Sequence, residues 1–266
     1  MGVQAGISHW RVAGTSGAWF VKLVPAARQE VLEAEADGLR ALSEPAVVGV
    51  PAVAAAGAAG GKAFLALTWL DLVEGGRDAT LGRALAALHR HTGATFGWHC
   101  DNTIGASPQR NDHDADWARF FAARRIAPQL AAAARRGYPV SAVSECERLL
   151  AKIPGILAGH RPVPSLLHGD LWAGNVGRER SGRPVVFDPA VYFGDRETDL
   201  AMTELFGGFD ADFGAAYREA WPLTPGYPVR RTLYNLYHVL NHFNLFGGAY
   251  GRRAVRMTQE LLAEAG

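Results

Sequence analysis

The stretch that decides the fold is His168-Gly169-Asp170-Leu171-Trp172-Ala173-Gly174-Asn175, together with Asp188 thirteen residues after its last position. A short apolar run precedes each carboxylate, at 164–167 and at 184–187. Runs of this composition are typical of buried strands. The sequence therefore places a carboxylate and an amide in one loop, and a second carboxylate just after a neighbouring strand.

These residue types are the ones that phosphoryl transfer from ATP requires. An aspartate orients the acceptor hydroxyl, while an asparagine and a second aspartate hold Mg²⁺. The Asp-x4-Asn spacing matches the catalytic loop of protein kinases, with His-Gly-Asp in place of His-Arg-Asp. Asp170 is accordingly the candidate catalytic residue, and Asn175 and Asp188 are the candidate Mg²⁺ ligands. His168 is interpreted as a structural residue that holds the loop through hydrogen bonds.

A lysine and a glutamate near the N-terminus are candidates for holding the ATP phosphates. Lys22 lies in a β-prone apolar run, where a lysine often does no more than protect a sheet edge. The following helix, expected over 28–42, carries Glu33 and Glu35. Kinases pair a strand lysine with a helix glutamate. Glu35 is preferred because it lies one helical turn from the apolar Val31, whereas Glu33 is expected to face solvent.

The order of apolar patterns predicts an α+β, bilobal, protein kinase-like fold. Residues 1–70 are expected to form a small mixed β-sheet lobe with one main helix. Residues 71–78 contain two adjacent glycines and are expected to be a connector. Residues 79–266 are expected to form a mainly helical lobe, with helices near 79–92, 112–136, 141–153, 196–206, 210–220, 228–247 and 252–265. Ligands favour the cleft between such lobes.

The nucleotide is expected to lie under a glycine turn near Gly6, before the first strand. This signal is weak, because no Gly-x-Gly-x-x-Gly pattern is present. Adenine is expected to bond backbone groups at the end of the second apolar strand, at Thr68, Trp69, Leu70 and Leu72.

Composition excludes several classes of function. The net charge of the 266 residues is only +1, which predicts neither a nucleic-acid partner nor an anionic membrane surface. No apolar run reaches the length of a membrane span, and no signal peptide is recognisable. Cys100 and Cys146 are too few for a disulfide framework and are interpreted as reduced thiols of a cytoplasmic protein. The oligomeric state stays open.

Four further polar residues are given other interpretations. His238 and His242 have a spacing that can ligate zinc, but the glutamate of a metalloprotease motif is missing. His238 is therefore interpreted either as core packing or as a wall of the substrate pocket. Asp195 opens the helix expected at 196–206 and is a candidate for a substrate contact. Asp199, in the same helix, is expected to brace the catalytic loop.

Several strings together resemble the fructosamine kinase (ketosamine-3-kinase) family, which is related to aminoglycoside phosphotransferases, choline kinases and protein kinases. The match covers nearly the whole chain, at 20–22, 33–39, 96–98, 101–105, 116–121, 165–175, 187–192, 194–209 and 237–242. The Asp-Asn-Thr-Ile-Gly string at 101–105 and the Leu-Trp pair after His-Gly-Asp separate this family from other small-molecule kinases.

The resemblance implies an ATP- and Mg²⁺-dependent kinase that phosphorylates the 3-hydroxyl of a ketoamine sugar on an amine or a lysine, a deglycation-type repair activity. It implies Asp170 as the catalytic base, Asn175 and Asp188 as Mg²⁺ ligands, and Lys22 with Glu35 as the pair that positions the phosphates.

Trp172 is either a packing residue or an acceptor contact, because an indole face can stack on a sugar or attract an amine cation. Two other functions stay open: an aminoglycoside- or choline-type phosphotransferase, and a nucleotide-binding pseudokinase. The N-terminus departs from the family pattern, which usually has a preceding segment and a fuller glycine turn.

Overall fold

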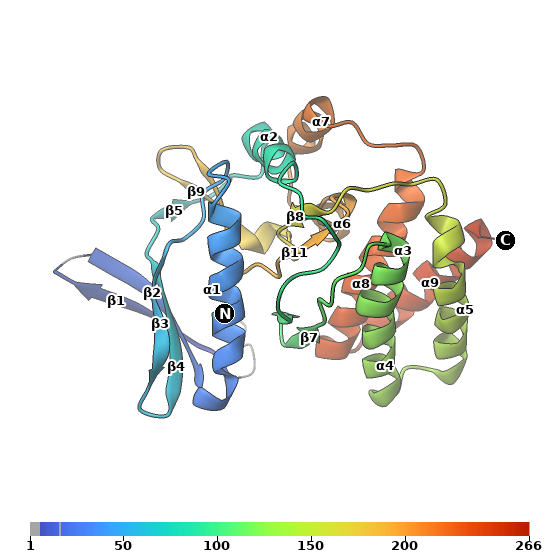
Figure 1. Cartoon of the computed structure of the whole chain (residues 1–266), viewed down its shortest axis with the longest axis horizontal. Coiled ribbons are helices and arrows are strands. Elements are labelled where there is room, and N and C mark those ends of the chain that lie inside the picture. Colours follow the sequence, from blue (N-terminus) through green and yellow to red (C-terminus); the bar gives the residue numbers. More distant parts are fainter. Residues whose placement is uncertain (1–5, 16, 266) are drawn as a thin grey trace.

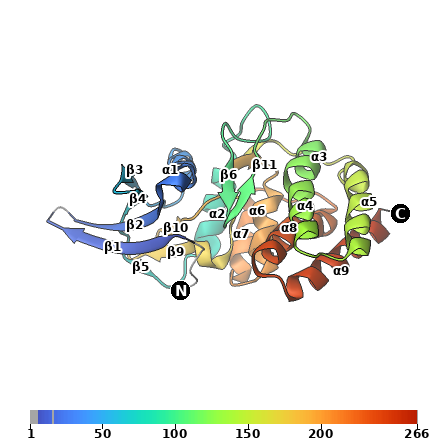
Figure 2. The ribbon, with the colours of Figure 1, turned by 90° about the horizontal axis from the view of Figure 1, so that it is seen from below.

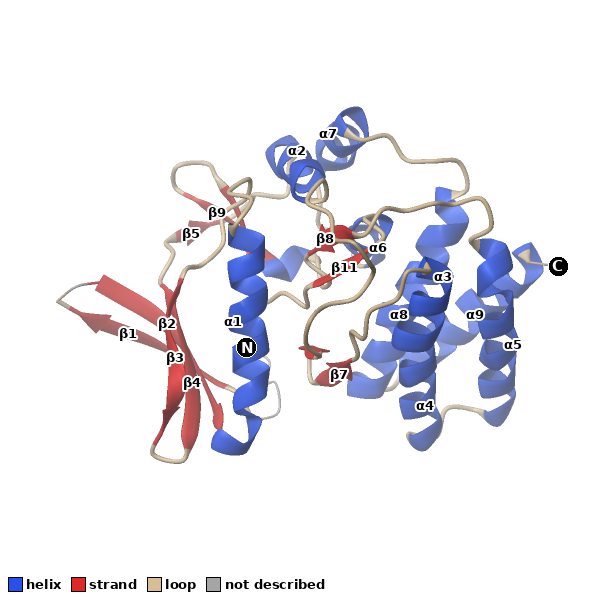
Figure 3. Cartoon of the chain, in the orientation of Figure 1, coloured by secondary structure: helices blue, strands red, loops and turns tan. Residues whose placement is uncertain are grey.

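A computed structural model describes residues 6–15 and 17–265. Figures 1 and 3 show a β-rich lobe formed by the N-terminal part of the chain beside a larger helical lobe. The α+β, bilobal expectation is therefore confirmed.

The N-terminal lobe is an antiparallel sheet with one helix packed on it. Its strands are β1 (Ser8–Gly14), β2 (Gly17–Pro25), β3 (Val53–Ala59) and β4 (Lys62–Thr68), in the spatial order β1-β2-β4-β3. Helix α1 (Gln29–Ser43) buries Leu32, Ala36 and Leu39 against Val24 and Leu65 of the sheet. The apolar side chains alternate along β4 and recur every three or four residues along α1, so each element has one buried face. The helix is thereby held flat on the sheet.

Strand β4 is shorter than the apolar run that predicted it. The ladder with β2 ends where Trp19 pairs with Thr68, so Trp69 and Leu70 leave the sheet although they continue the run. The following residues form the short β5 (Leu72–Val73), which pairs with β9 (Val176–Glu179). Strand β9 also pairs with β10 (Pro184–Val186). This three-stranded sheet connects the end of the N-terminal lobe to the segment between the two candidate magnesium ligands.

The C-terminal lobe is built from helices around a large apolar core. The helices are α2 (Ala79–Leu88), α3 (Trp117–Phe120), α4 (Ala127–Arg135), α5 (Val140–Ile156), α6 (Glu197–Leu205), α7 (Ala211–Ala220), α8 (Tyr227–Phe246) and α9 (Ala249–Glu264). Helix α8 is buried along most of its length and packs against α4, α6 and α9. No helix within the described ranges is long and apolar enough to cross a membrane.

The region before α3 differs from the sequence prediction. The helix expected over 112–136 begins at Trp117 and includes a π-helical turn, Phe121–Ile126, before α4. Two short strands that periodicity missed, β6 (Asn102–Ile104) and β7 (Ser107–Gln109), form a hairpin. Three residues are too few for an alternating pattern to be recognised. In Figures 1 and 2 this hairpin lies between α1 and the C-terminal helices.

Strands β8 (Ser165–Leu167) and β11 (Tyr192–Gly194) pair in the middle of the C-terminal lobe and lead into α6. At this junction the buried Asp195 carboxylate accepts hydrogen bonds from His160 Nε2 (2.6 Å), the Tyr234 hydroxyl (2.6 Å) and the backbone N–H of Glu197 (3.0 Å). Burial raises the pKa of Asp195, but the bond and charge of His160 and the bond from Tyr234 outweigh it and hold this pKa below its ordinary value.

We predict that Asp195→Asn lowers the free energy of unfolding by about 1–3 kcal/mol at pH 7, because three bonds to a charged acceptor are weakened. A carboxylate whose pKa is lower in the folded than in the unfolded protein stabilises the fold above its unfolded-state pKa, about 4. This stabilisation is lost as the pH falls through the folded-state pKa. Urea denaturation should therefore show a large difference from wild type at pH 7 and a smaller one near about pH 3. Asp212→Asn, at an exposed helix position, is the control. An equal difference at both pH values would contradict the assignment.

Candidate active site

The loop after β8 carries the first candidate residues and is fixed by side chains far away in the sequence. Asp199 of α6 accepts hydrogen bonds from the backbone N–H groups of His168 (2.8 Å) and Gly169 (2.9 Å). Burial raises the pKa of Asp199, but the hydrogen bond from His89 outweighs it and keeps this pKa below its ordinary value. An ionised Asp199 therefore holds the start of the loop, in agreement with the bracing role expected for it.

His168 fastens the same loop to the neighbouring strand segment. Its Nε2 lies 3.0 Å from the carbonyl oxygen of Phe187, and its Nδ1 accepts the backbone N–H of Asp170 at 3.2 Å. Burial lowers the pKa of His168, so the ring is neutral with its proton on Nε2. The contacts are those of a structural residue.

Asp170 lies at a cavity of about 250 Å³ that the two lobes share. Asn175 Nδ2 donates to the carbonyl oxygen of Asp170 at 2.9 Å, which closes the turn between them. Burial, and then the negative charge of Asp188, raise the pKa of Asp170 to about 7. A carboxylate with this pKa can take a proton from a bound hydroxyl near neutral pH.

Lys22 joins the two lobes at the edge of the same cavity. Its Nζ is 2.7 Å from Glu35 Oε1 and 2.6 Å from Asp188 Oδ1. Strand β2 has a partner on both sides, so Lys22 is not an edge-strand lysine, and that alternative is wrong. The exposed Glu33 accepts a hydrogen bond from Gln29 instead, at 2.6 Å. Burial lowers the pKa of Lys22, but the charges of Glu35 and Asp188 outweigh it and raise this pKa, so the amine is charged.

Asn175 and Asp188 present oxygens suited to a divalent cation. The Asn175 amide uses its nitrogen for Asp170, and no described residue donates to its oxygen. The Asp188 side chain is 46% exposed toward the cavity, and one of its oxygens has no partner among the described residues. Asp188 also has a φ of 55°, a left-handed conformation that residues other than glycine adopt infrequently. An amide oxygen and a carboxylate beside open space fit Mg²⁺, which keeps several waters.

A second cavity, of about 360 Å³, meets the first at Asp188. All four residues expected at the adenine site line it, namely Thr68, Trp69, Leu70 and Leu72, together with Phe20, Leu67 and Phe187. The amides of Trp69 and Leu72 already donate to Ala18 and Leu70. The amides of Leu70 and Asp71 have no partner among the described residues, so this segment can bond a flat heterocycle. Gly6 has a φ of 87° but lines neither cavity.

The three candidate substrate residues are not brought together. Trp172 is 42% exposed and lines the first cavity, with its ring over Gly174. Asp195 lies outside that cavity with its carboxylate fully engaged, so its assignment as a substrate contact is wrong. His238 is buried in α8 and lines no part of the cavity, and burial lowers its pKa to about 3. Of its two interpretations, core packing is the one that the structure supports.

The sequence analysis gave no role to residues of the β6–β7 hairpin, yet Asn102, Thr103 and Gly105 line the first cavity opposite Asp170. The hairpin is held there because Asn102 Nδ2 donates to the carbonyl oxygen of Val191 at 2.8 Å. The sequence did contain a signal for these residues, because the string at 101–105 is one of the motifs that resemble the family. That motif did not indicate where in the site its residues lie.

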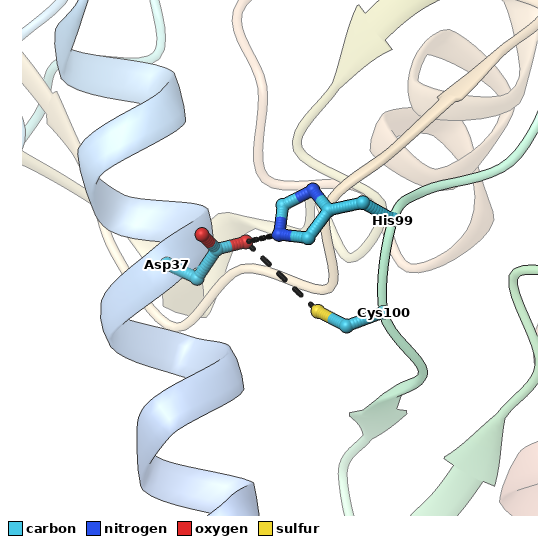
Figure 4. Close-up of side chains that lie close together, drawn as sticks. All are labelled: Asp37, His99 and Cys100. Carbon is cyan, nitrogen blue, oxygen red and sulfur yellow. Dashed lines mark hydrogen bonds and ion pairs between the residues drawn. The ribbon is translucent and has the colours of Figure 1, made fainter.

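Helix α1 is clamped to the loop before this hairpin (Figure 4). Asp37 Oδ2 accepts a hydrogen bond from Trp98 Nε1 at 2.7 Å and lies 3.2 Å from His99 Nε2 and 4.0 Å from Cys100 Sγ. Since Asp37 is two residues after Glu35, the clamp also fixes the carboxylate that holds Lys22. Cys100 and the buried Cys146 are both free thiols, as predicted.

Comparison with known proteins identifies the family. Residues 4–264 match the sequence model of the fructosamine kinases. The chain belongs to the fructosamine kinase family. A probable ketoamine kinase of Synechocystis is 47% identical over 249 residues, which are 92% of this chain and 83% of that protein. A chloroplastic protein-ribulosamine 3-kinase of Oryza sativa subsp. indica is 35% identical over 251 residues, 93% of this chain and 73% of that protein.

Solved structures agree with this family assignment. A putative fructosamine-3-kinase from Haemophilus somnus superposes with a TM-score of 0.91 at 29% identity, covering 98% of this chain and 90% of that one. An aminoglycoside phosphotransferase solved with AMP-PNP and hygromycin B superposes with a TM-score of 0.66 at 16% identity, covering 100% and 93% of the two chains. The kinase-like fold is confirmed, and as a fructosamine kinase family member the chain is an ATP-dependent phosphotransferase.

We predict that Gly169→Ala destabilises the protein by about 1–3 kcal/mol more than Gly182→Ala. Both glycines have positive φ angles, 81° and 92°, so both variants bear the cost of an alanine there. A Cβ at Gly169 would in addition collide with the carbonyl oxygen of Ala190, whereas a Cβ at Gly182 would meet open space. Urea denaturation measures the difference. Equal losses in the two variants would show that the loop can move away from Ala190.

Proposed function

We propose that this protein transfers the γ-phosphoryl group of ATP to the 3-hydroxyl of a ketoamine sugar carried by an amine or a lysine. One observation carries the proposal: a single cavity joins Lys22, Asp170, Asn175 and Asp188, and it continues into an apolar cavity of the right kind for adenine. The names of the Synechocystis and Oryza relatives support a ketoamine acceptor.

In this mechanism Asp170 orients the acceptor hydroxyl and takes its proton as the phosphoryl group is transferred. Its carboxylate lies at the cavity, and the bond from Asn175 together with the bracing of the loop by Asp199 keeps it there. The raised pKa of Asp170 suits a general base near neutral pH. The protein therefore supplies position and a proton acceptor, which are the main protein contributions to phosphoryl transfer.

Asn175 and Asp188 would hold Mg²⁺, which supplies positive charge against the β- and γ-phosphate oxygens. Lys22 would supply a second positive charge to the phosphates. Its ammonium is shared between Glu35 and Asp188, at 2.7 and 2.6 Å. A nucleotide phosphate would take the place of Asp188 on Lys22, which Glu35 would keep in position, and Asp188 would then be free to hold Mg²⁺.

We predict that Asp170→Asn lowers kcat by about 10²–10⁴-fold, because the amide cannot accept the proton. The Kd for ATP, measured by calorimetry, should change by less than about threefold, since Asp170 faces the acceptor and not the apolar cavity. Lys22→Met is the contrasting variant, and it should weaken ATP binding as well. If Asp170→Asn lost ATP binding to the same extent as Lys22→Met, Asp170 would have a structural role instead.

An acceptor panel tests the substrate class. The purified protein, with ATP and Mg²⁺, should phosphorylate a fructosamine or ribulosamine, and NMR of the product should place the phosphate on the 3-oxygen. Phosphorylation of an aminoglycoside or of choline, with none of the ketoamines, would support the other phosphotransferase class. No turnover with any acceptor, combined with ATP binding, would indicate a pseudokinase.

A further inference from the structure

Four aromatic rings gather on one side of the C-terminal lobe, and we name them the aromatic ledge. They are Phe206 after α6, His242 and Phe246 of α8, and Tyr250 of α9. The His242 ring is central, with its centroid 4.9 Å from Phe206, 5.6 Å from Phe246 and 5.1 Å from Tyr250. Phe246 is 69% exposed and Phe206 is 39% exposed. A contiguous group of partly exposed rings is a candidate contact surface.

The aromatic ledge lies near the cavity that holds Asp170. Gly105 lines that cavity, and a Cβ built on it would lie 3.2 Å from Leu245 Cδ1, the residue before Phe246. On the other side, a Cβ on Gly208 would lie 2.7 Å from the Cβ of Ala173 in the catalytic loop. Leu245 thus lies beside the cavity wall at Gly105, and Gly208 lies beside Ala173, which stands between two residues of that wall, so chain neighbours of the ledge rings approach the cavity from two sides.

The charge around the aromatic ledge disfavours a cationic ligand. Burial lowers the pKa of His242, and the charge of Arg253 lowers it further, so the ring is neutral. His242 Nδ1 bonds the carbonyl oxygen of His238 at 2.8 Å. Within the described ranges, no carboxylate forms a hydrogen bond or ion pair with any of the four rings. The positive charge of Arg253 would repel a polycationic acceptor, whereas an uncharged aromatic group would find ring faces to stack on.

We infer that the aromatic ledge binds the amine-side substituent of the ketoamine, and that it selects substituents with an aromatic group. The inference rests on the proposed function: with the sugar at Asp170 and Trp172, the nitrogen substituent leaves the cavity along the ledge. Stacking on Phe206, Phe246 and Tyr250 then adds binding energy away from the reacting atoms, which enzymes use to raise kcat/KM.

The test compares two ketoamines with the same 1-deoxyfructosyl sugar, one carrying a phenethyl group on nitrogen and the other a methyl group. We expect wild-type kcat/KM to be about three- to tenfold higher for the phenethyl compound, the range that one aromatic contact supplies. Phe246→Ala should lower kcat/KM for the phenethyl compound by most of that factor and leave the methyl compound within about twofold. Val140→Ala, an exposed apolar truncation at the start of α5, is the matched control and should change neither value.

The outcomes separate the inference from the proposed function. The ledge inference would be overturned if wild type phosphorylated both ketoamines with equal kcat/KM. It would also be overturned if Phe246→Ala lost kcat/KM equally for both compounds with an unchanged melting temperature. Either result would leave the proposed ketoamine kinase activity intact. Phosphorylation of neither ketoamine would overturn the proposed function and the ledge with it. Tyr250→Ala is a second test of the ledge, because it removes another of its rings, from a different helix.

Discussion

The arrangement of this protein depends on one ammonium group held between two carboxylates. Lys22 comes from the sheet of the N-terminal lobe, Glu35 from the helix packed on that sheet, and Asp188 from the C-terminal lobe. A buried charge is costly unless it is paired, and removing one partner of a buried pair costs about 3–5 kcal/mol. The three groups therefore tie the two lobes together at the cavity.

The rest of the site is held by hydrogen bonds from three polar side chains, of which only Asn102 lines the cavity. Asp199 fixes the backbone of the catalytic loop, Asp37 clamps α1 through Trp98, and Asn102 ties the β6–β7 hairpin to Val191. Each is a polar side chain bonding groups distant in sequence, so the cavity walls cannot shift independently. Such support is what positioning catalysis needs, because small displacements of a base or a metal ligand cost large factors in rate.

Sequence reasoning placed residues correctly where spacing within one segment decides their position. Asp170 and Asn175 lie in one short loop, as their spacing predicts, and helical periodicity singled out Glu35, not Glu33, as the partner of Lys22. It failed at Asp195 and gave no role to the β6–β7 hairpin. A carboxylate at a helix start looks the same in sequence whether it meets a ligand or a buried tyrosine and histidine. A three-residue strand is too short for a period to be recognised.

The sequence by itself determined the two lobes, the family and the residue types of the candidate phosphate-binding and catalytic groups, because local periodicity and motif spacing depend only on neighbours along the chain. Only the tertiary structure decided which of these groups meet. Lys22 and Asp188 are 166 residues apart along the chain and 2.6 Å apart in space. The aromatic ledge likewise joins rings from the end of α6, from α8 and from α9. No pattern within one segment specifies such contacts, because they arise from the packing of helices around a common core.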